Sequence, residues 1–179
     1  MTNVRRLVHG WCMRKFYSRV HPRWRAYDYA QPGVYFVTTV SHGRDPIFGV
    51  PTSRGIVLTR AGHVVDRCWL RVPEQFEGVT VDRFVVMPDH VHAIVVLLCT
   101  PARTASLSEV VAWTKRRASL DIRAGIRDRT APIWQRSFHD RLIRNTAALD
   151  QVRKYIAANP SRAWNAIAAQ SSRRIDTHA

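Results

Sequence analysis

The sequence predicts an α+β fold in which an antiparallel, ferredoxin-like sheet carries helices packed on one face. Two β-branched, apolar segments at 79–87 and 90–98 are separated only by a short Pro-Asp turn, which is typical of a hairpin. Further predicted strands at 34–40 and 138–143 alternate with segments of helical periodicity. Strands joined both by a hairpin and by helices indicate an antiparallel sheet covered by helices.

The first half of the chain contains an arm, a strand and a helix. Residues 1–30 are basic and aromatic without a clean period, and we expect an N-terminal arm there. A Gln-Pro-Gly turn at 31–33 precedes the β-branched and aromatic run at 34–40, which predicts the first strand. Apolar residues between 58 and 72 follow helical spacing, and Pro73 should end that helix. The hairpin then supplies the second and third strands.

Two further helices enclose the fourth strand. The first, over about 106–122, begins with the spacing of a capping box, in which Ser106 and Glu109 satisfy each other's free backbone N–H groups. The last main helix is expected over 146–158 and should be closed by Asn159-Pro160. Its apolar face consists of Leu149, Val152 and Ile156.

The length of 179 residues predicts one compact domain with added ends. We expect the arm at 1–30, a main domain at 31–165 and a polar C-terminal tail at 166–179. Because 46% of the residues are hydrophobic, the main domain can bury a core, which excludes wholesale disorder.

The chain is strongly basic. Lys and Arg total 28 against 13 acidic residues, a formal net charge of +15, and nearly all of the 28 are arginine. Arginine binds phosphate through a planar, bidentate fork, so the excess favours a polyanionic partner, with nucleic acid as the first interpretation. The alternative is a generally basic surface or a coding bias that favours arginine.

The same composition excludes several classes of protein. No apolar run approaches the ~20 residues that span a bilayer, and the N-terminus lacks the apolar stretch of a secretory signal, so no membrane partner is expected. The three cysteines, Cys12, Cys68 and Cys99, form no Cys-x-x-Cys pair, which argues against a disulfide framework or a cysteine zinc site. A cytoplasmic location fits best.

Two histidines on the third predicted strand could hold a metal. His90 and His92 flank one residue, so both imidazoles leave the same face of the strand. A surface or half-buried pair without a ligand is the alternative. The strand is otherwise so apolar that it should be central, and an unsatisfied buried polar group costs roughly 1–3 kcal/mol. We therefore expect a metal, another ligand or a hydrogen-bond network on that face.

A tyrosine and an asparagine on the last helix could reach this pair. Tyr155 lies beside the apolar face, and Asn159 follows one turn later on nearly the same line. Tyr155 would offer a phenolic oxygen and Asn159 a carbonyl oxygen. Taken alone, each residue has an ordinary explanation, boundary packing for the tyrosine and a helix C-terminus for the asparagine.

Four motifs in this order resemble a known family. The first motif combines Tyr27-Asp-Tyr29 with the first predicted strand, Gly33-Val-Tyr-Phe-Val-Thr38. The other three are Val86-Met-Pro-Asp-His-Val-His92, Trp134-Gln-Arg-Ser-Phe-His-Asp140 and Tyr155-Ile-Ala-Ala-Asn-Pro160. Together they resemble the IS200-like single-tyrosine (Y1, HUH) transposases, and within them the REP-associated tyrosine transposase branch. The similarity spans about residues 25–165.

The resemblance implies a site and a reaction. Tyr155 would match the nucleophilic tyrosine, His90 and His92 the metal-binding pair, and Asn159 the third ligand of a divalent Mg²⁺ or Mn²⁺ ion. The implied enzyme is a metal-dependent single-stranded DNA endonuclease and strand transferase that forms a 5′-phosphotyrosine intermediate at repeat-derived hairpin sites. His139 and Asp140 fall in a recurring motif of the family and are candidates to support the metal site.

The implied partner is single-stranded DNA with hairpins, bound by a monomer in preference to a dimer. The candidate DNA contacts, by phosphate binding or base stacking, are Lys115, Arg116, Arg117, Arg136, Arg141, Arg144, Trp24 and Tyr27. Two alternatives stay open: a replication initiator or relaxase with the same chemistry, and a non-catalytic nucleic-acid-binding regulator on the same fold. A second tyrosine near Tyr155 would favour the former, and the sequence has none.

Overall fold

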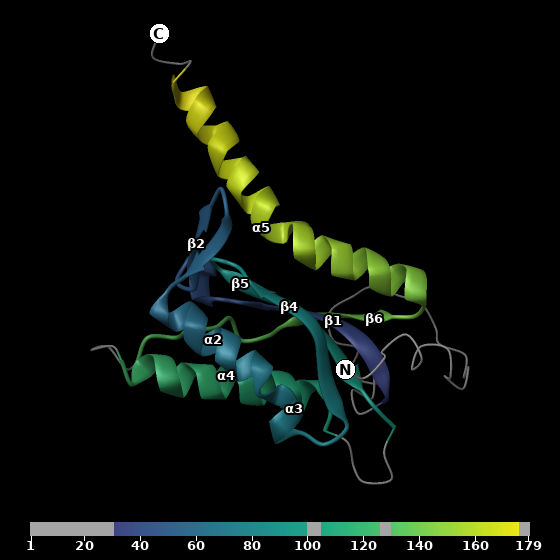
Figure 1. The fold of residues 1–179 in the computed structure, drawn as a ribbon. Coiled ribbons are helices and arrows are strands. Elements are labelled where there is room, and N and C mark those ends of the chain that lie inside the picture. The colour runs from purple at the N-terminus through teal and green to yellow at the C-terminus, as the bar shows by residue number, and fades with distance from the viewer. Residues whose placement is uncertain (1–30, 100–104, 126–129, 176–179) are drawn as a thin grey trace.

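A four-stranded antiparallel sheet forms the centre of the molecule in a computed structural model. The structure describes residues 31–99, 105–125 and 130–175. The strands are β1 (Gly33–Val40), β4 (Val79–Val86), β5 (His90–Leu97) and β6 (His139–Ile143). They lie in the order β4-β5-β1-β6, and every neighbouring pair is antiparallel (Figure 1). With one helical connection on each side of the β4–β5 hairpin, this is the ferredoxin-like arrangement that the sequence predicts.

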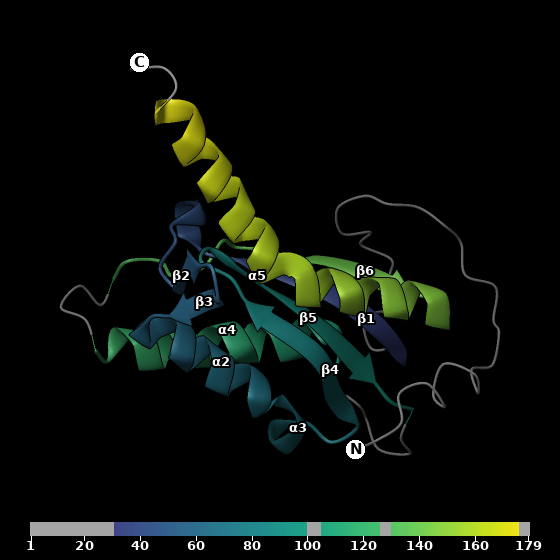
Figure 2. The ribbon, with the colours of Figure 1, turned by 45° about the horizontal axis from the view of Figure 1, so that its top comes forward.

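Helices cover both faces of the sheet. Helices α2 (Arg60–Leu70), α3 (Val72–Gln75) and α4 (Leu107–Arg123) lie on one side, and α5 (Thr146–Ile175) lies on the other (Figures 1 and 2). The α+β class is confirmed, but the expectation of helices on one face only is wrong.

The reason is the composition of the two central strands, which are apolar on both sides. Residues such as Val37, Val91 and Val95 face the core shared with α2 and α4. The alternate residues form a second core with α5, which consists of Val34, Ile94, Val96, Ile143, Leu149, Val152 and Ile156. The apolar face predicted for the last helix is therefore buried, on the side of the sheet where β5 places its histidines.

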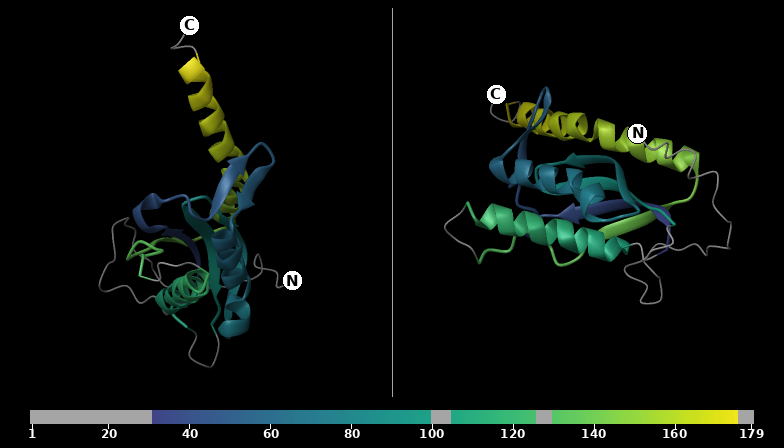
Figure 3. Two further views of the ribbon diagram at one scale, coloured as in Figure 1. Left: turned by 90° about the vertical axis from the view of Figure 1, so that its left-hand side faces the viewer. Right: turned by 60° about the horizontal axis from the view of Figure 1, so that its bottom comes forward.

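A second, small sheet was not expected from the sequence. Strands β2 (Gly49–Thr52) and β3 (Gly55–Leu58) form a hairpin beside α5, preceded by the short 3₁₀ turn η1 (His42–Arg44) (Figure 3). Its strands are only four residues long and expose Val50 and Val57, so neither shows the alternation by which a strand is found.

The start of α2 depends on a close backbone approach. A Cβ atom on Gly62 would lie 1.9 Å from the carbonyl oxygen of Phe48. The same turn is capped by Thr59, whose hydroxyl accepts a hydrogen bond from the Gly62 N–H at 3.1 Å and donates one to Ile47. No side chain fits at residue 62 unless α2 moves away from this segment.

We expect Gly62→Ala to lower the free energy of unfolding by about 1–3 kcal/mol, because the added methyl group overpacks the junction. Urea unfolding followed by circular dichroism measures the change. Gly125→Ala is the matched control, since its Cβ would meet only the guanidinium end of Arg60, at 3.0 Å. Equal losses in the two variants would contradict the explanation.

The C-terminal helix is longer than predicted. The capping box of Ser106 and Glu109 is confirmed at the start of α4, but α5 does not end at Asn159-Pro160 and continues to Ile175. It changes direction along its length (Figure 1), and Pro160 explains the bend, because its ring clashes with the preceding turn and it has no N–H to donate. The expected boundary between domain and tail, at 165/166, thus falls inside α5. The expected arm at 1–30 lies outside the described residues.

Among the helices of the described ranges, none combines the length and the apolar character needed to traverse a bilayer.

Candidate active site

The two histidines stand at the start of β5, on the face that α5 covers. Their rings lie 4.6 Å apart between centroids, and His92 is buried with 7% of its surface exposed. The strand register places Thr38 of β1 directly beside His92. The predicted pair therefore exists as a rigid unit on the central strands.

Each imidazole is oriented by a hydrogen bond to its Nδ1 atom. The Nδ1 of His92 lies 2.8 Å from the Thr38 hydroxyl oxygen, and the Nδ1 of His90 lies 2.5 Å from a carboxylate oxygen of Asp89. When Nδ1–H donates to these oxygens, each Nε2 atom carries the free lone pair, as in metal-binding histidines with oriented rings. Neither partner was predicted from the sequence. Asp89 adjoins His90 in the sequence, but Thr38 becomes visible only through the strand register.

Burial keeps His92 neutral. The pKa of His92 is lowered to about 4, mainly by desolvation and also by the nearby His90, while Asp89 acts in the opposite direction. The imidazole is therefore uncharged at neutral pH, which is the form that can bind a metal ion or accept a hydrogen bond.

Tyr155 reaches the histidines from α5 of the same chain. Its hydroxyl oxygen lies 3.3 Å from Nε2 of His92, and the two rings are 5.3 Å apart between centroids. Phe36 stacks on His92 and meets the Tyr155 ring edge-on, at 5.1 Å and 5.9 Å. Tyr155 still exposes 38% of its surface, so a polymer can approach the hydroxyl from outside.

Asn159 lies one turn further along α5, and its role as a third metal ligand stays a prediction. It is buried, and within the described chain its amide nitrogen has no hydrogen-bond partner. The described residues contain no cluster of three or more His, Cys, Asp or Glu side chains that could hold a metal. Two oriented imidazoles and one carboxamide oxygen would be a donor set compatible with Mn²⁺ or Mg²⁺.

Thr38 provides a test of this donor set. We expect Thr38→Val to weaken Mn²⁺ binding by about 10–100-fold, because the hydroxyl that orients His92 is lost while the β-branched shape is kept. Isothermal titration calorimetry measures the affinity. Thr39→Val is the matched control, since Thr39 is buried on the opposite face of β1 and its hydroxyl has no partner among the described residues. Unchanged affinity in Thr38→Val would count against a metal on His92.

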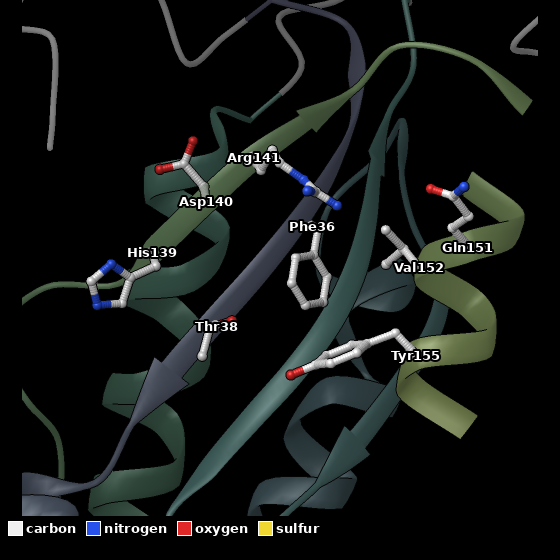
Figure 4. A pocket seen from close by; sticks show the side chains of 8 residues that line it. All are labelled: Phe36, Thr38, His139, Asp140, Arg141, Gln151, Val152 and Tyr155. Carbon is white, nitrogen blue, oxygen red and sulfur yellow. The ribbon is translucent and has the colours of Figure 1, made fainter. Parts of the chain in front are cut away.

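A pocket of about 470 Å³ opens beside Tyr155, between α5 and the edge formed by β1 and β6. His139 and Asp140 belong to its lining, but Figure 4 shows both side chains pointing away from the Tyr155 hydroxyl. Their proposed support of the metal site stays a prediction. Arg141, by contrast, extends across the strand toward α5 (Figure 4).

The predicted DNA contacts fall in different places. Lys115, Arg116 and Arg117 lie on α4, in the layer across the sheet from Tyr155 (Figure 1). The Lys115 ammonium donates to the carbonyl oxygens of Gln135 and Ser137 and so fastens α4 to the segment before β6.

The remaining arginines are exposed. Arg117 pairs with Asp121 at 3.0 Å, and Arg116 is exposed on the same helix. Arg136, Arg141 and Arg144 are exposed in and around β6, and only Arg141 lines the pocket. Trp24 and Tyr27 lie outside the described residues.

One further cation near Tyr155 was not predicted from the sequence. The Arg162 guanidinium lies over the Tyr155 ring, 5.6 Å from its centroid. The two residues are seven positions apart, which is two turns of one helix. This spacing did not predict the contact, because the helix was expected to end at Pro160.

Helix α5 is anchored to the sheet by a partly buried ion pair just before Tyr155. The Arg153 guanidinium donates two hydrogen bonds to the carboxylate of Asp82, at 2.7 and 2.6 Å, and a third to Asp150 at 3.3 Å. The hydrogen bond to Asp82 is the main cause that raises the pKa of Arg153. Asp82 sits where the β4–β5 register shifts between Val81 and Arg83, so an irregularity in β4 holds the carboxylate that fixes α5.

Comparison with known proteins places this site in a family context. The family model described as "Transposase IS200 like" matches residues 69–159, just over half of the chain, including both histidines, Tyr155 and Asn159. A Haemophilus influenzae protein of uncharacterized function is 26% identical over 154 residues, covering 77% of this chain and 86% of the relative. A solved REP-associated tyrosine transposase bound to a REP hairpin shares the fold, with a TM-score of 0.56, 22% identity, and coverage of 79% and 74% of the two chains.

Proposed function

Because the chain belongs to the IS200-like transposase family of DNA-processing enzymes, we propose that it cuts and rejoins single-stranded DNA through a covalent bond to Tyr155. One observation carries the proposal: the Tyr155 hydroxyl lies 3.3 Å from Nε2 of His92, in a site completed within one chain. A tyrosine placed only for packing would not need its polar end against a buried imidazole. We propose that the monomer is the active unit.

In the proposed reaction the Tyr155 hydroxyl oxygen attacks the scissile phosphorus. A bond forms between that oxygen and phosphorus, and the bond from phosphorus to the 3′ oxygen breaks. The phenolic proton passes to solvent and the departing oxygen takes one up as a free 3′-OH. The phosphodiester energy is kept in the 5′-phosphotyrosine, so attack by a second 3′-OH restores a DNA strand and the phenol.

His90, His92 and Asn159 would hold a divalent ion, Mg²⁺ or Mn²⁺. When bound, such an ion withdraws negative charge from the phosphate oxygens and orients the scissile phosphate. The neutral donors would leave most of the ionic charge for that purpose. Thr38 and Asp89 keep the two imidazoles in the binding orientation.

We propose single-stranded DNA carrying hairpins as the substrate. The formal charge of +15 favours a polyanion, and the exposed Arg141 on β6 lines the pocket. The solved REP-associated tyrosine transposase with the same fold is bound to a REP hairpin. A hairpin repeat is therefore the substrate class we extend to this chain.

The test uses oligonucleotides with the hairpin repeats that flank the gene, labelled at either end and incubated with the protein and Mn²⁺. A 5′-phosphotyrosine leaves the 3′-labelled piece on the protein after denaturation and releases the 5′-labelled piece with a 3′-OH that a polymerase can extend. EDTA should prevent both products. Tight binding with no adduct on any repeat would instead identify a non-catalytic regulator.

A further inference from the structure

We propose that the pocket beside Tyr155 holds a purine base of the nucleotide next to the scissile phosphate, and that Arg141 and Gln151 select it. This inference rests on the proposed function and adds a base preference to it. The pocket volume of about 470 Å³ lies in the range of small-ligand sites. Tyr155 forms part of its wall, so the pocket adjoins the residue that carries the attacking hydroxyl.

The apolar wall of the pocket suits a flat ring. Phe36 from β1 and Val152 from α5 both line it, and Figure 4 shows the Phe36 ring on the side of β1 that faces α5. Phe36 is half-buried and held by its contacts with His92 and Tyr155, so its ring is fixed before a ligand enters. Stacking on such an aromatic surface is the usual way in which proteins bind unpaired bases.

Two polar side chains face each other at the rim. Arg141 is the Cα partner of Phe36 on β6, and Gln151 stands on α5 one turn before Tyr155. Both are exposed, and within the described chain neither makes a hydrogen bond or an ion pair. Figure 4 shows the Arg141 guanidinium reaching across Phe36 toward α5, with the Gln151 carboxamide at the facing rim.

These two groups are the ones that read purine edges. A guanidinium can donate two hydrogen bonds to O6 and N7 of guanine, and a carboxamide pairs in the same bidentate way with N6 and N7 of adenine. Pyrimidines have no N7 and therefore cannot offer this edge of the base. A pocket with an aromatic ring in its wall and these two polar groups at its rim should therefore favour a purine over a pyrimidine.

The experiment measures initial rates of adduct formation on the hairpin oligonucleotide that reacts in the assay above. The nucleotides immediately 5′ and 3′ of the cut are replaced in turn by each base and by an abasic residue. At one of the two positions, wild-type protein should prefer a purine over a pyrimidine or an abasic residue by about ten-fold. Arg141→Ala and Gln151→Ala should each reduce that preference, measured for each variant as the ratio of its rates on the purine and pyrimidine substrates.

Arg116→Ala is the matched control, since it also removes an exposed arginine but on α4, across the sheet. It should keep the full base preference. The proposal is overturned if wild-type protein shows no purine preference at either position, or if the preference survives both Arg141→Ala and Gln151→Ala. Adducts that form without base preference would contradict only the proposed base-binding pocket. The absence of adducts on every repeat would contradict the proposed function.

A binding measurement keeps the pocket testable even without cleavage. Oligonucleotides with 2-aminopurine at either flanking position are titrated with the protein, and the fluorescence reports stacking of that base. Quenching at one position, diminished in Gln151→Ala and Arg141→Ala, supports a base in the pocket. Unquenched fluorescence at both positions in a saturated complex contradicts it.

Discussion

Tyr155→Phe is expected to abolish the covalent protein–DNA adduct while DNA affinity stays within about two-fold, because one exposed hydroxyl adds little to polyanion binding. The substitution keeps the ring that packs against His92 and Phe36 and removes only the oxygen that would attack phosphorus. Denaturing electrophoresis of the end-labelled hairpin measures the adduct, and fluorescence anisotropy of the same oligonucleotide measures binding.

Tyr35→Phe is the matched control for this result. Tyr35 is buried in the other core and donates its hydroxyl hydrogen bond to the Gln31 carbonyl at 2.9 Å, far from the histidines along β1. It should retain adduct formation. An adduct of undiminished yield in Tyr155→Phe would show that another group attacks the DNA.

The same variant also tests whether the site is completed within one chain. A mixture of Tyr155→Phe and His92→Ala should remain inactive. A site completed within one chain needs the phenol and the imidazole on the same copy, and neither variant has both. Recovery of adduct in the mixture would mean that α5 of one copy serves the histidines of another.

Asp82→Ala is expected to lower the free energy of unfolding by about 3–5 kcal/mol, because it leaves the Arg153 guanidinium without its main partner in a mostly buried site. The side chains of Arg153 and Asp82 expose 19% and 10% of their surface, and the pair is bidentate. Urea unfolding measures the loss. The rate of adduct formation should fall as well, since Tyr155 lies two residues from the anchor.

A double-mutant cycle separates the pair from its surroundings. Asp82→Ala combined with Arg153→Ala should cost clearly less than the sum of the single changes, because the second substitution removes the charge that the first leaves unpaired. The exposed pair Arg117–Asp121 on α4 is the control, where Arg117→Ala should change stability by less than about 1 kcal/mol. Strict additivity at Asp82 and Arg153 would contradict a coupled anchor.

The parts of the fold with strong local signals were predictable from the sequence. The Ser106–Glu109 capping box, the 79–98 hairpin and the period of two that puts His90 and His92 on one face all follow from neighbouring residues. Tyr155 and Asn159 lie where helical spacing places them on α5.

The errors concern features that depend on distant packing. A proline usually ends a helix, yet α5 continues through Pro160 with a bend. Predicting that both faces of the sheet are covered requires the knowledge that β1 and β5 are its central strands. Strand register sets Thr38 as the partner of His92, and an irregularity in β4 sets Asp82 as the partner of Arg153. None of these leaves a pattern in the local sequence.

Burial of β5 on both faces also determines which side of the candidate site is more rigid. Val91, Ile94 and Val96 have no exposed surface, and the strand is paired along both edges. Its amide hydrogens should exchange with deuterium only when the whole domain unfolds, whereas those of α5 should exchange through smaller local openings. The two imidazoles therefore lie on the strand that we expect to exchange most slowly. Tyr155 lies on a helix that we expect to open locally while the sheet stays folded.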